Sequence, residues 1–99
     1  MRWSAAALEL SLRIPLGDSL KAKRSVIRPI LDGAHRRFGV ASAEVDLHDQ
    51  HDRAVLVFAA VASTPRQVDE VLDAVDRFVW SFPEVEVHGT DRYWVDTAS

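Results

Sequence analysis

The 99-residue sequence contains no cysteine, which excludes a disulfide framework, a cysteine-based zinc site and a thiol nucleophile. Its longest apolar run, residues 54–62, is too short to cross a bilayer, which takes roughly 20 residues. The first residues lack the apolar core of a secretory signal. Glycine-rich phosphate loops, nucleophile elbows and helix-turn-helix patterns are also missing. These absences favour a cytoplasmic, non-catalytic protein without a cofactor or metal.

What is present is the composition of one ordinary globular domain. Hydrophobic residues make up 47% and charged residues 27% of the chain. A chain of this length can bury one core without a metal or disulfide. We therefore expect a single domain over residues 1–96, followed by a short tail at residues 97–99.

Charge is distributed unevenly along the chain. Residues 1–40 carry eight Lys and Arg against three Asp and Glu, a net charge of +5. Residues 41–99 carry four Lys and Arg against twelve Asp and Glu, a net charge of −8. Such a split fits a basic surface for a polyanion. It equally fits two solvated helices of opposite composition.

The first half of the sequence predicts a strand and a helix. Alternation of apolar and polar residues indicates a half-buried strand over residues 3–14. Apolar residues at three- and four-residue spacing from Leu20 to Phe38 then indicate an amphipathic helix that ends before Gly39. Pro29 inside this helix predicts a kink, or a regular helix that begins only near Ser25.

The second half predicts two strands, a helix and a final strand. Alternation from Ala43 to His48 indicates a strand with one solvated face, and residues 49–52 read as a hairpin turn. Residues 54–62 are apolar on both faces, as in a central strand. Thr64, Pro65 and Gln67 form a helix-start signature. The last strand follows Pro83, with a bulge or bend at Gly89.

This order of elements predicts an α+β fold, the ferredoxin-like βαββαβ arrangement, with two helices on one face of a four-stranded antiparallel sheet. Its central strands are the first and third. Because the third strand is apolar on both sides, some of its side chains must lie on the uncovered face, and such patches commonly bind partners. We expect a homo-oligomer interface there, formed by Val55, Leu56, Val57 and Phe58.

Basic residues gather at the start of the first predicted helix. At about 100° per residue, Lys21, Arg24 and Arg28 lie within about 60° of one another. Phosphate contacts by such a stripe give salt-sensitive, sequence-independent binding. We expect nucleic-acid binding by Lys21, Lys23, Arg24 and Arg28, with RNA or a ribosomal particle as partner; a solvated helix rim is the alternative.

The predicted hairpin carries ligand types for a divalent metal, namely His48, Asp49, His51 and Asp52. Polar turns are commonly made of these residues, so spacing alone does not predict a site. The same cluster holds groups for acid–base chemistry, but no nucleophile or oxyanion hole accompanies them.

Residues 19–24 (Ser-Leu-Lys-Ala-Lys-Arg), Arg28, Arg37-Phe38, Ala43-Glu44-Val45, Asp49 and Arg53-Ala54 together resemble the YlxP-like family of small bacterial proteins, a domain of unknown function numbered five hundred and three. The resemblance covers roughly residues 5–82. It implies a ferredoxin-like fold and no established activity. Family members often lie beside translation and ribosome-maturation genes, which implies an RNA or ribosome association.

Overall fold

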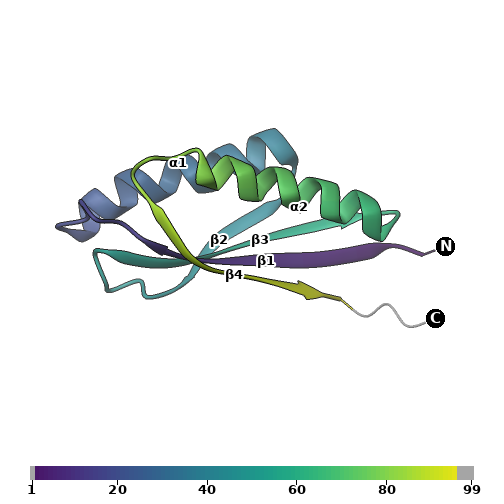
Figure 1. Ribbon diagram of the computed structural model, residues 1–99, viewed down its shortest axis with the longest axis horizontal. Coiled ribbons are helices and arrows are strands. Elements are labelled where there is room, and N and C mark those ends of the chain that lie inside the picture. Colours follow the sequence, from purple (N-terminus) through teal and green to yellow (C-terminus); the bar gives the residue numbers. More distant parts are fainter. Residues whose placement is uncertain (1, 96–99) are drawn as a thin grey trace.

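The computed structural model describes residues 2–95 and has the predicted element order (Figure 1). The elements are β1 (Ser4–Arg13), α1 (Leu20–Phe38), β2 (Ala41–Asp46), β3 (Arg53–Ala62), α2 (Pro65–Trp80) and β4 (Glu86–Trp94). The four strands form one antiparallel sheet in the order β2-β3-β1-β4. The ferredoxin-like prediction is therefore confirmed, with β1 and β3 at the centre. The predicted tail at residues 97–99 lies outside the described residues.

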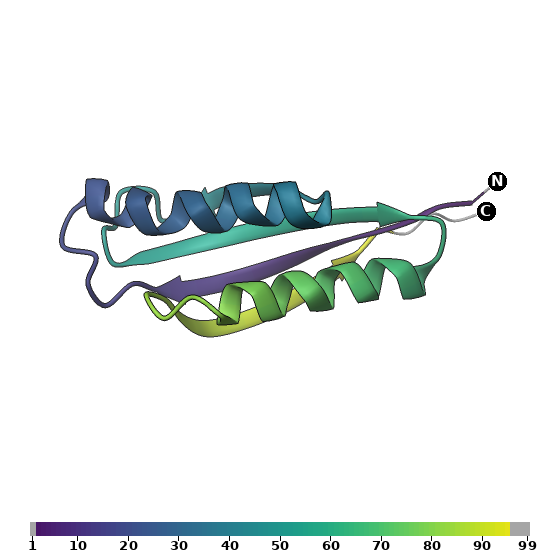
Figure 2. The same ribbon diagram turned by 90° about the horizontal axis from the view of Figure 1, so that it is seen from above.

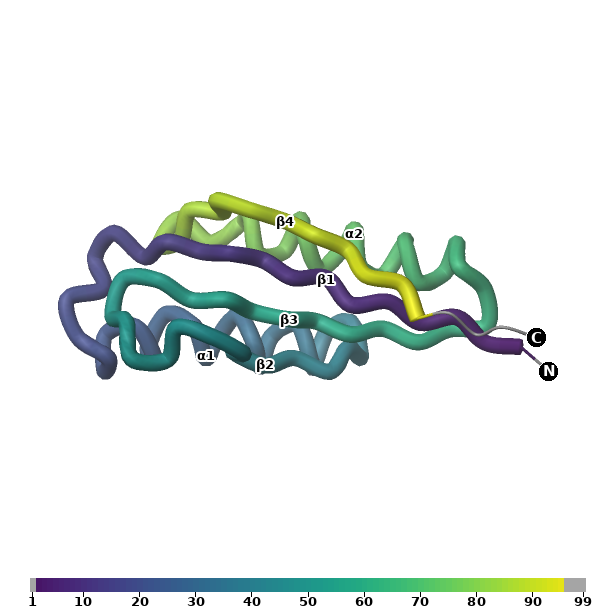
Figure 3. Tube along the Cα trace, turned by 90° about the horizontal axis from the view of Figure 1, so that it is seen from below, coloured from purple at the N-terminus to yellow at the C-terminus, as the bar shows by residue number. Residues whose placement is uncertain are grey.

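Both helices cover the same face of the sheet and run antiparallel to each other (Figures 1 and 2). The opposite face is uncovered in the view from below (Figure 3). Alternate residues of β1 and β3 point toward the helices and are buried with apolar residues of α1 and α2. The largest apolar side chains of this core are Leu8, Leu10, Ile14, Ile30, Leu56, Phe58 and Leu72, and Ile14 directly follows β1.

The helix boundaries follow the predicted signals. Gly39 ends α1 in the left-handed conformation, with φ of 68°, which glycine adopts without the steric penalty of a side chain. Thr64 caps α2 through a complete capping box with Gln67. The alternative of a regular helix from Ser25 is wrong, because α1 begins at Leu20 and continues through Pro29.

Strand β2 shows an unexpected orientation. Its register with β3 pairs Ala43 with Val57, so Ala43 lies on the uncovered face with Val57. Ala43 and Val45 are exposed there, whereas Ser42 and Glu44 point toward α1. The solvated side of β2 is thus its apolar side, because the polar side has partners on the helix.

The last strand has the predicted irregularity. The pairing of β4 with β1 shifts between Ser11, opposite Gly89, and Leu12, opposite Val87. One extra residue, His88, therefore separates the two registers, as in a β-bulge. Among residues 2–95, no helix is long and apolar enough to cross a membrane.

Candidate nucleic-acid interface

Four exposed cations lie on the side of α1 that faces away from the sheet. Lys21, Arg24 and Arg28 form the predicted stripe, and Arg36 extends it toward the end of the helix. At about 100° per residue they occupy roughly a third of the helix circumference, opposite the buried side. We call Lys21, Arg24, Arg28 and Arg36 the α1 basic face.

The α1 basic face surrounds one carboxylate, that of Asp32, but forms no ion pair with it. Arg24 Nε donates to the Leu20 carbonyl at 3.4 Å, and Arg36 Nε donates to the Asp32 carbonyl at the same distance. None of the four cations forms a salt bridge with a carboxylate among residues 2–95. They surround a surface hollow together with Ser25, Pro29 and Asp32. Their guanidinium and ammonium groups remain available to an anion.

Helix stability explains only part of this arrangement. Arg36 lies in the last turn, where a cation interacts favourably with the helix dipole. Lys21 lies in the first turn, where a cation opposes the dipole at a cost of about 0.3–1 kcal/mol. No acidic residue occupies that turn to compensate. Lys21 therefore has no stabilising role within the helix.

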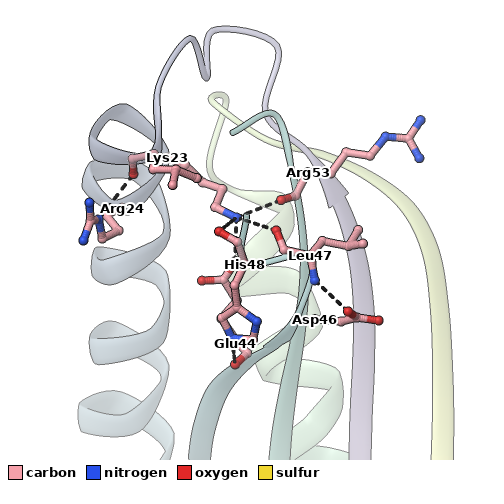
Figure 4. A network of polar contacts seen from close by, with 8 residues as sticks. Lys23, Arg24, Glu44, Asp46, Leu47, His48 and Arg53 are labelled. Carbon is pink, nitrogen blue, oxygen red and sulfur yellow. Dashed lines mark hydrogen bonds and ion pairs between the residues drawn. The ribbon is translucent and has the colours of Figure 1, made fainter. Parts of the chain in front are cut away.

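Lys23 does not belong to the α1 basic face, which corrects the predicted set of phosphate ligands. Its side chain is buried, with 1% of the residue exposed, and extends toward the β2–β3 hairpin (Figure 4). The ammonium lies 2.8 Å from Glu44 Oε2 and donates to the carbonyls of Leu47 at 2.9 Å and Arg53 at 3.1 Å. The carbonyl of His48 lies at 3.4 Å. We call this arrangement the Lys23 clamp.

The Lys23 clamp holds a backbone conformation that is costly by itself. Leu47 has a φ of 60°, the only positive φ among the described residues other than glycine. Bulky side chains adopt this region at a cost of about 1–2 kcal/mol. Asp46 Oδ1 accepts a hydrogen bond from the Leu47 amide, and Lys23 binds the Leu47 carbonyl (Figure 4). The contacts on both sides of Leu47 keep the hairpin in this shape.

The histidines of the hairpin have separate structural roles. The His48 ring contacts the Glu44 carbonyl, and the His51 ring contacts the Gly17 carbonyl in the loop before α1. A Cβ atom at Gly17 would lie only 2.2 Å from the His51 carbonyl oxygen, so this close approach requires glycine. No group of three His, Asp or Glu side chains within residues 2–95 is arranged to hold a metal ion.

The uncovered sheet face carries only half of the residues predicted for an oligomer interface. Val55 and Val57 lie on this face and are half-buried. Leu56 and Phe58 point toward the helices and are fully buried, which removes them from any surface interface. Val61, at 71% exposure, continues the apolar side of β3 instead. The alternation of a strand makes these two sets mutually exclusive.

Negative charge lies on α2 and on the uncovered face near β4. Arg92 reaches from β4 to Asp69 and Asp73 of α2, at 2.5 and 3.1 Å. On the uncovered face, Asp91 is paired with Glu9. The carboxylate of Asp91, and to a smaller extent that of Glu9, raises the pKa of the neighbouring Tyr93, because a nearby negative charge disfavours the phenolate. These carboxylates and the α1 basic face therefore lie on different elements of the fold.

The burial of Lys23, though not its contacts, was detectable in the sequence. Lys23, Ile27, Ile30 and Ala34 recur at the spacing of one helix side, and the other three form the buried side of α1. A lysine on an apolar stripe needs an acidic or carbonyl partner when it is buried. Glu44 supplies the carboxylate from β2, but the three carbonyls depend on the hairpin conformation.

Comparison with known proteins identifies relatives of the whole domain. The family described as "Protein of unknown function (DUF503)" matches residues 5–92. The uncharacterized protein YlxP of Bacillus subtilis (strain 168) is 37% identical over 76 residues, which cover 77% of this chain and 83% of that relative. The family match spans both helices and reaches all four strands. The chain therefore belongs to the DUF503 family of proteins of unknown function.

Proposed function

We propose that this protein is a non-catalytic RNA- or ribosome-associated domain that binds phosphates through the α1 basic face. The observation that carries the proposal is the group of four exposed cations without carboxylate partners on one side of α1. One of them, Lys21, opposes the helix dipole and gains nothing from the fold. Lys and Arg side chains in this arrangement bind phosphates largely independently of sequence.

The surrounding surface favours one orientation of a polyanion. The acidic residues of α2 and the carboxylates Glu9 and Asp91 lie away from the α1 basic face. They repel phosphates, so a polyanion approaches the outer side of α1 rather than the sheet. The excess of negative charge over the whole chain, −3, then limits unspecific binding elsewhere.

Co-sedimentation with ribosomal particles at low salt tests this function. The test variant replaces the α1 basic face by glutamine: K21Q, R24Q, R28Q and R36Q. A matched control removes four exposed arginines from other elements: R13Q, R53Q, R66Q and R77Q. We expect the wild type and the control to co-sediment and the test variant to remain in the supernatant. Absence of wild-type co-sedimentation, or equal loss in both variants, contradicts the proposal.

A second candidate function is self-association through the uncovered sheet face. It is favoured by the exposed apolar residues Val45, Val61 and Tyr93, at 46%, 71% and 56% exposure. The strands have ten residues in β1 and β3, six in β2 and nine in β4. At about 3.3 Å per residue and about 4.8 Å between strands, the face offers about 550 Å². A standard interface buries about 800 Å² per partner. Two copies stacked by this face would each bury about two-thirds of that area.

Light scattering over a concentration series tests self-association. We expect a mass above the 11.1 kDa of one chain, and a return to that mass when Val61 is replaced by aspartate. The exposed Trp80 lies on α2, outside the uncovered face, so W80D serves as a control that leaves the mass unchanged. A persistent 11.1 kDa wild type refutes the second candidate.

A further inference from the structure

The α1 basic face carries no Phe, Tyr or Trp. The only such residue of α1 is Phe38, whose ring packs against Phe78 at 5.6 Å, and Arg37 lies over both rings. The other ring of α1, His35, has its Nδ1 atom 3.0 Å from the Val40 carbonyl. The exposed aromatic residues of the described chain lie on other elements: Trp3, Trp80, Tyr93 and Trp94. Proteins that bind single strands stack bases on aromatic rings, at about 1–3 kcal/mol per base. The α1 basic face lacks these rings.

The uncovered face of the sheet does not supply a row of aromatic rings on its central strands either. Sheet surfaces that bind single-stranded RNA use aromatic residues of their central strands. Here the uncovered face of β1 and β3 carries alanine and valine at most positions, and Glu9 lies at its middle opposite Asp91. The negative potential of these carboxylates also raises the pKa of Tyr93, the aromatic residue nearest to them. A phosphate chain is repelled from this face.

The cations lie on one helix and are spaced along its axis. At about 1.5 Å of rise per residue, Arg24 and Arg28 lie about 6 Å apart along the helix axis, and Lys21 and Arg36 lie about 22 Å apart. Double-stranded DNA presents about one phosphate per 1.7 Å of its axis. An RNA double helix also presents closely spaced phosphates on a rigid backbone. A flexible single strand must be ordered along α1, and no base stacking offsets that loss of entropy.

We infer that the ligand of the α1 basic face is a double-helical region of RNA, contacted through its phosphates and not through its bases. This inference rests on the proposed function and specifies its ligand. It needs only positive charge facing a rigid phosphate backbone, and the four cations of α1 supply that charge. It also predicts weak dependence on base sequence, since no side chain of the face reads base edges in a fixed geometry.

Fluorescence anisotropy with two labelled RNAs tests the inference. One is a 20-base-pair duplex, and the other is an unstructured pyrimidine-rich strand with the same number of phosphates. We expect the duplex to bind at least tenfold more tightly at 50 mM salt. With four phosphate contacts the logarithm of the binding constant should fall with a slope near −3.6, roughly 10²-fold between 50 and 200 mM salt. K21Q should reduce the slope by about one.

The outcomes separate the inference from the function on which it rests. Equal or tighter binding of the single strand, lost in the α1 glutamine variant, overturns the duplex ligand and leaves RNA binding by α1 in place. Failure of both RNAs to bind refutes the two together. The control variant R13Q/R53Q/R66Q/R77Q should retain duplex binding, and thermal unfolding of both variants confirms that the fold is intact.

Discussion

Replacement of Lys23 by methionine removes the ammonium from the Lys23 clamp and keeps most of the side-chain volume. Glu44 Oε2 and the carbonyls of Leu47 and Arg53 then lose their donor. Water cannot reach the position freely, because Lys23 is 1% exposed. The substitution therefore leaves a carboxylate and backbone acceptors without partners at a largely buried position.

The magnitude follows from the two kinds of contact. A hydrogen bond to a charged group contributes about 1.5–3 kcal/mol, and breaking a buried ion pair costs about 3–5 kcal/mol in total. The Glu44 side chain is 17% exposed and can be partly rehydrated, so the lower part of this range applies. We expect K23M to lower the free energy of unfolding by about 3–4 kcal/mol. The total free energy of unfolding of a domain is only about 5–15 kcal/mol, so this loss is a large part of it.

Urea unfolding followed by circular dichroism measures this loss. K21M makes the same chemical change two residues earlier at an exposed position, and it should leave the free energy of unfolding unchanged or raise it by up to about 1 kcal/mol. K23M/E44Q removes the orphaned negative charge and should recover at least about 1 kcal/mol relative to K23M. A K23M protein within about 1 kcal/mol of K21M would refute the clamp as a stabilising contact.

Two further predictions concern the helix contact and the uncovered face. Gly33 of α1 faces Phe78 of α2, and a Cβ atom there would lie 2.6 Å from the Phe78 ring. Gly33→Ala should therefore lower the free energy of unfolding by about 1–2 kcal/mol although alanine favours helices, and calorimetric stabilisation would contradict this packing. The raised pKa of Tyr93 means that folding favours the neutral phenol, so its contribution is present below pH 10 and is lost as the pH rises through the folded pKa. Asp91→Asn should lower that pKa in a phenolate absorbance titration; an unchanged pKa would show that Asp91 and Glu9 are not its cause.

The fold was predictable from the sequence because its local signals agree with one another. Thr64 with Gln67 marks the start of α2, Gly39 marks the end of α1, and both work through contacts within four residues. Alternation in β1 predicts which side chains are buried, since only one side of that strand faces the helices. Such signals need no knowledge of distant parts of the chain.

The candidate site was only partly predictable. The position of Lys23 depends on carbonyls 24–30 residues away and on the left-handed conformation of Leu47, which no local pattern indicates. The sequence does not predict which side of β3 faces solvent, because neighbouring residues on opposite sides, such as Val57 and Phe58, are both apolar. Which side is covered depends on where the helices pack. The prediction grouped Lys23 with the exposed residues Lys21, Arg24 and Arg28 because it considered only their positive charge.

The Lys23 clamp also has a kinetic consequence. Its ammonium joins the start of α1 to both strands of the β2–β3 hairpin, so it closes long loops and completes its contacts only when helix and hairpin have docked. Interactions that form after the folding transition state change the unfolding rate and hardly the folding rate. K23M should therefore raise the unfolding rate constant and leave the refolding rate constant almost unchanged. The Lys23 clamp thus sets how long the domain stays folded once it has formed.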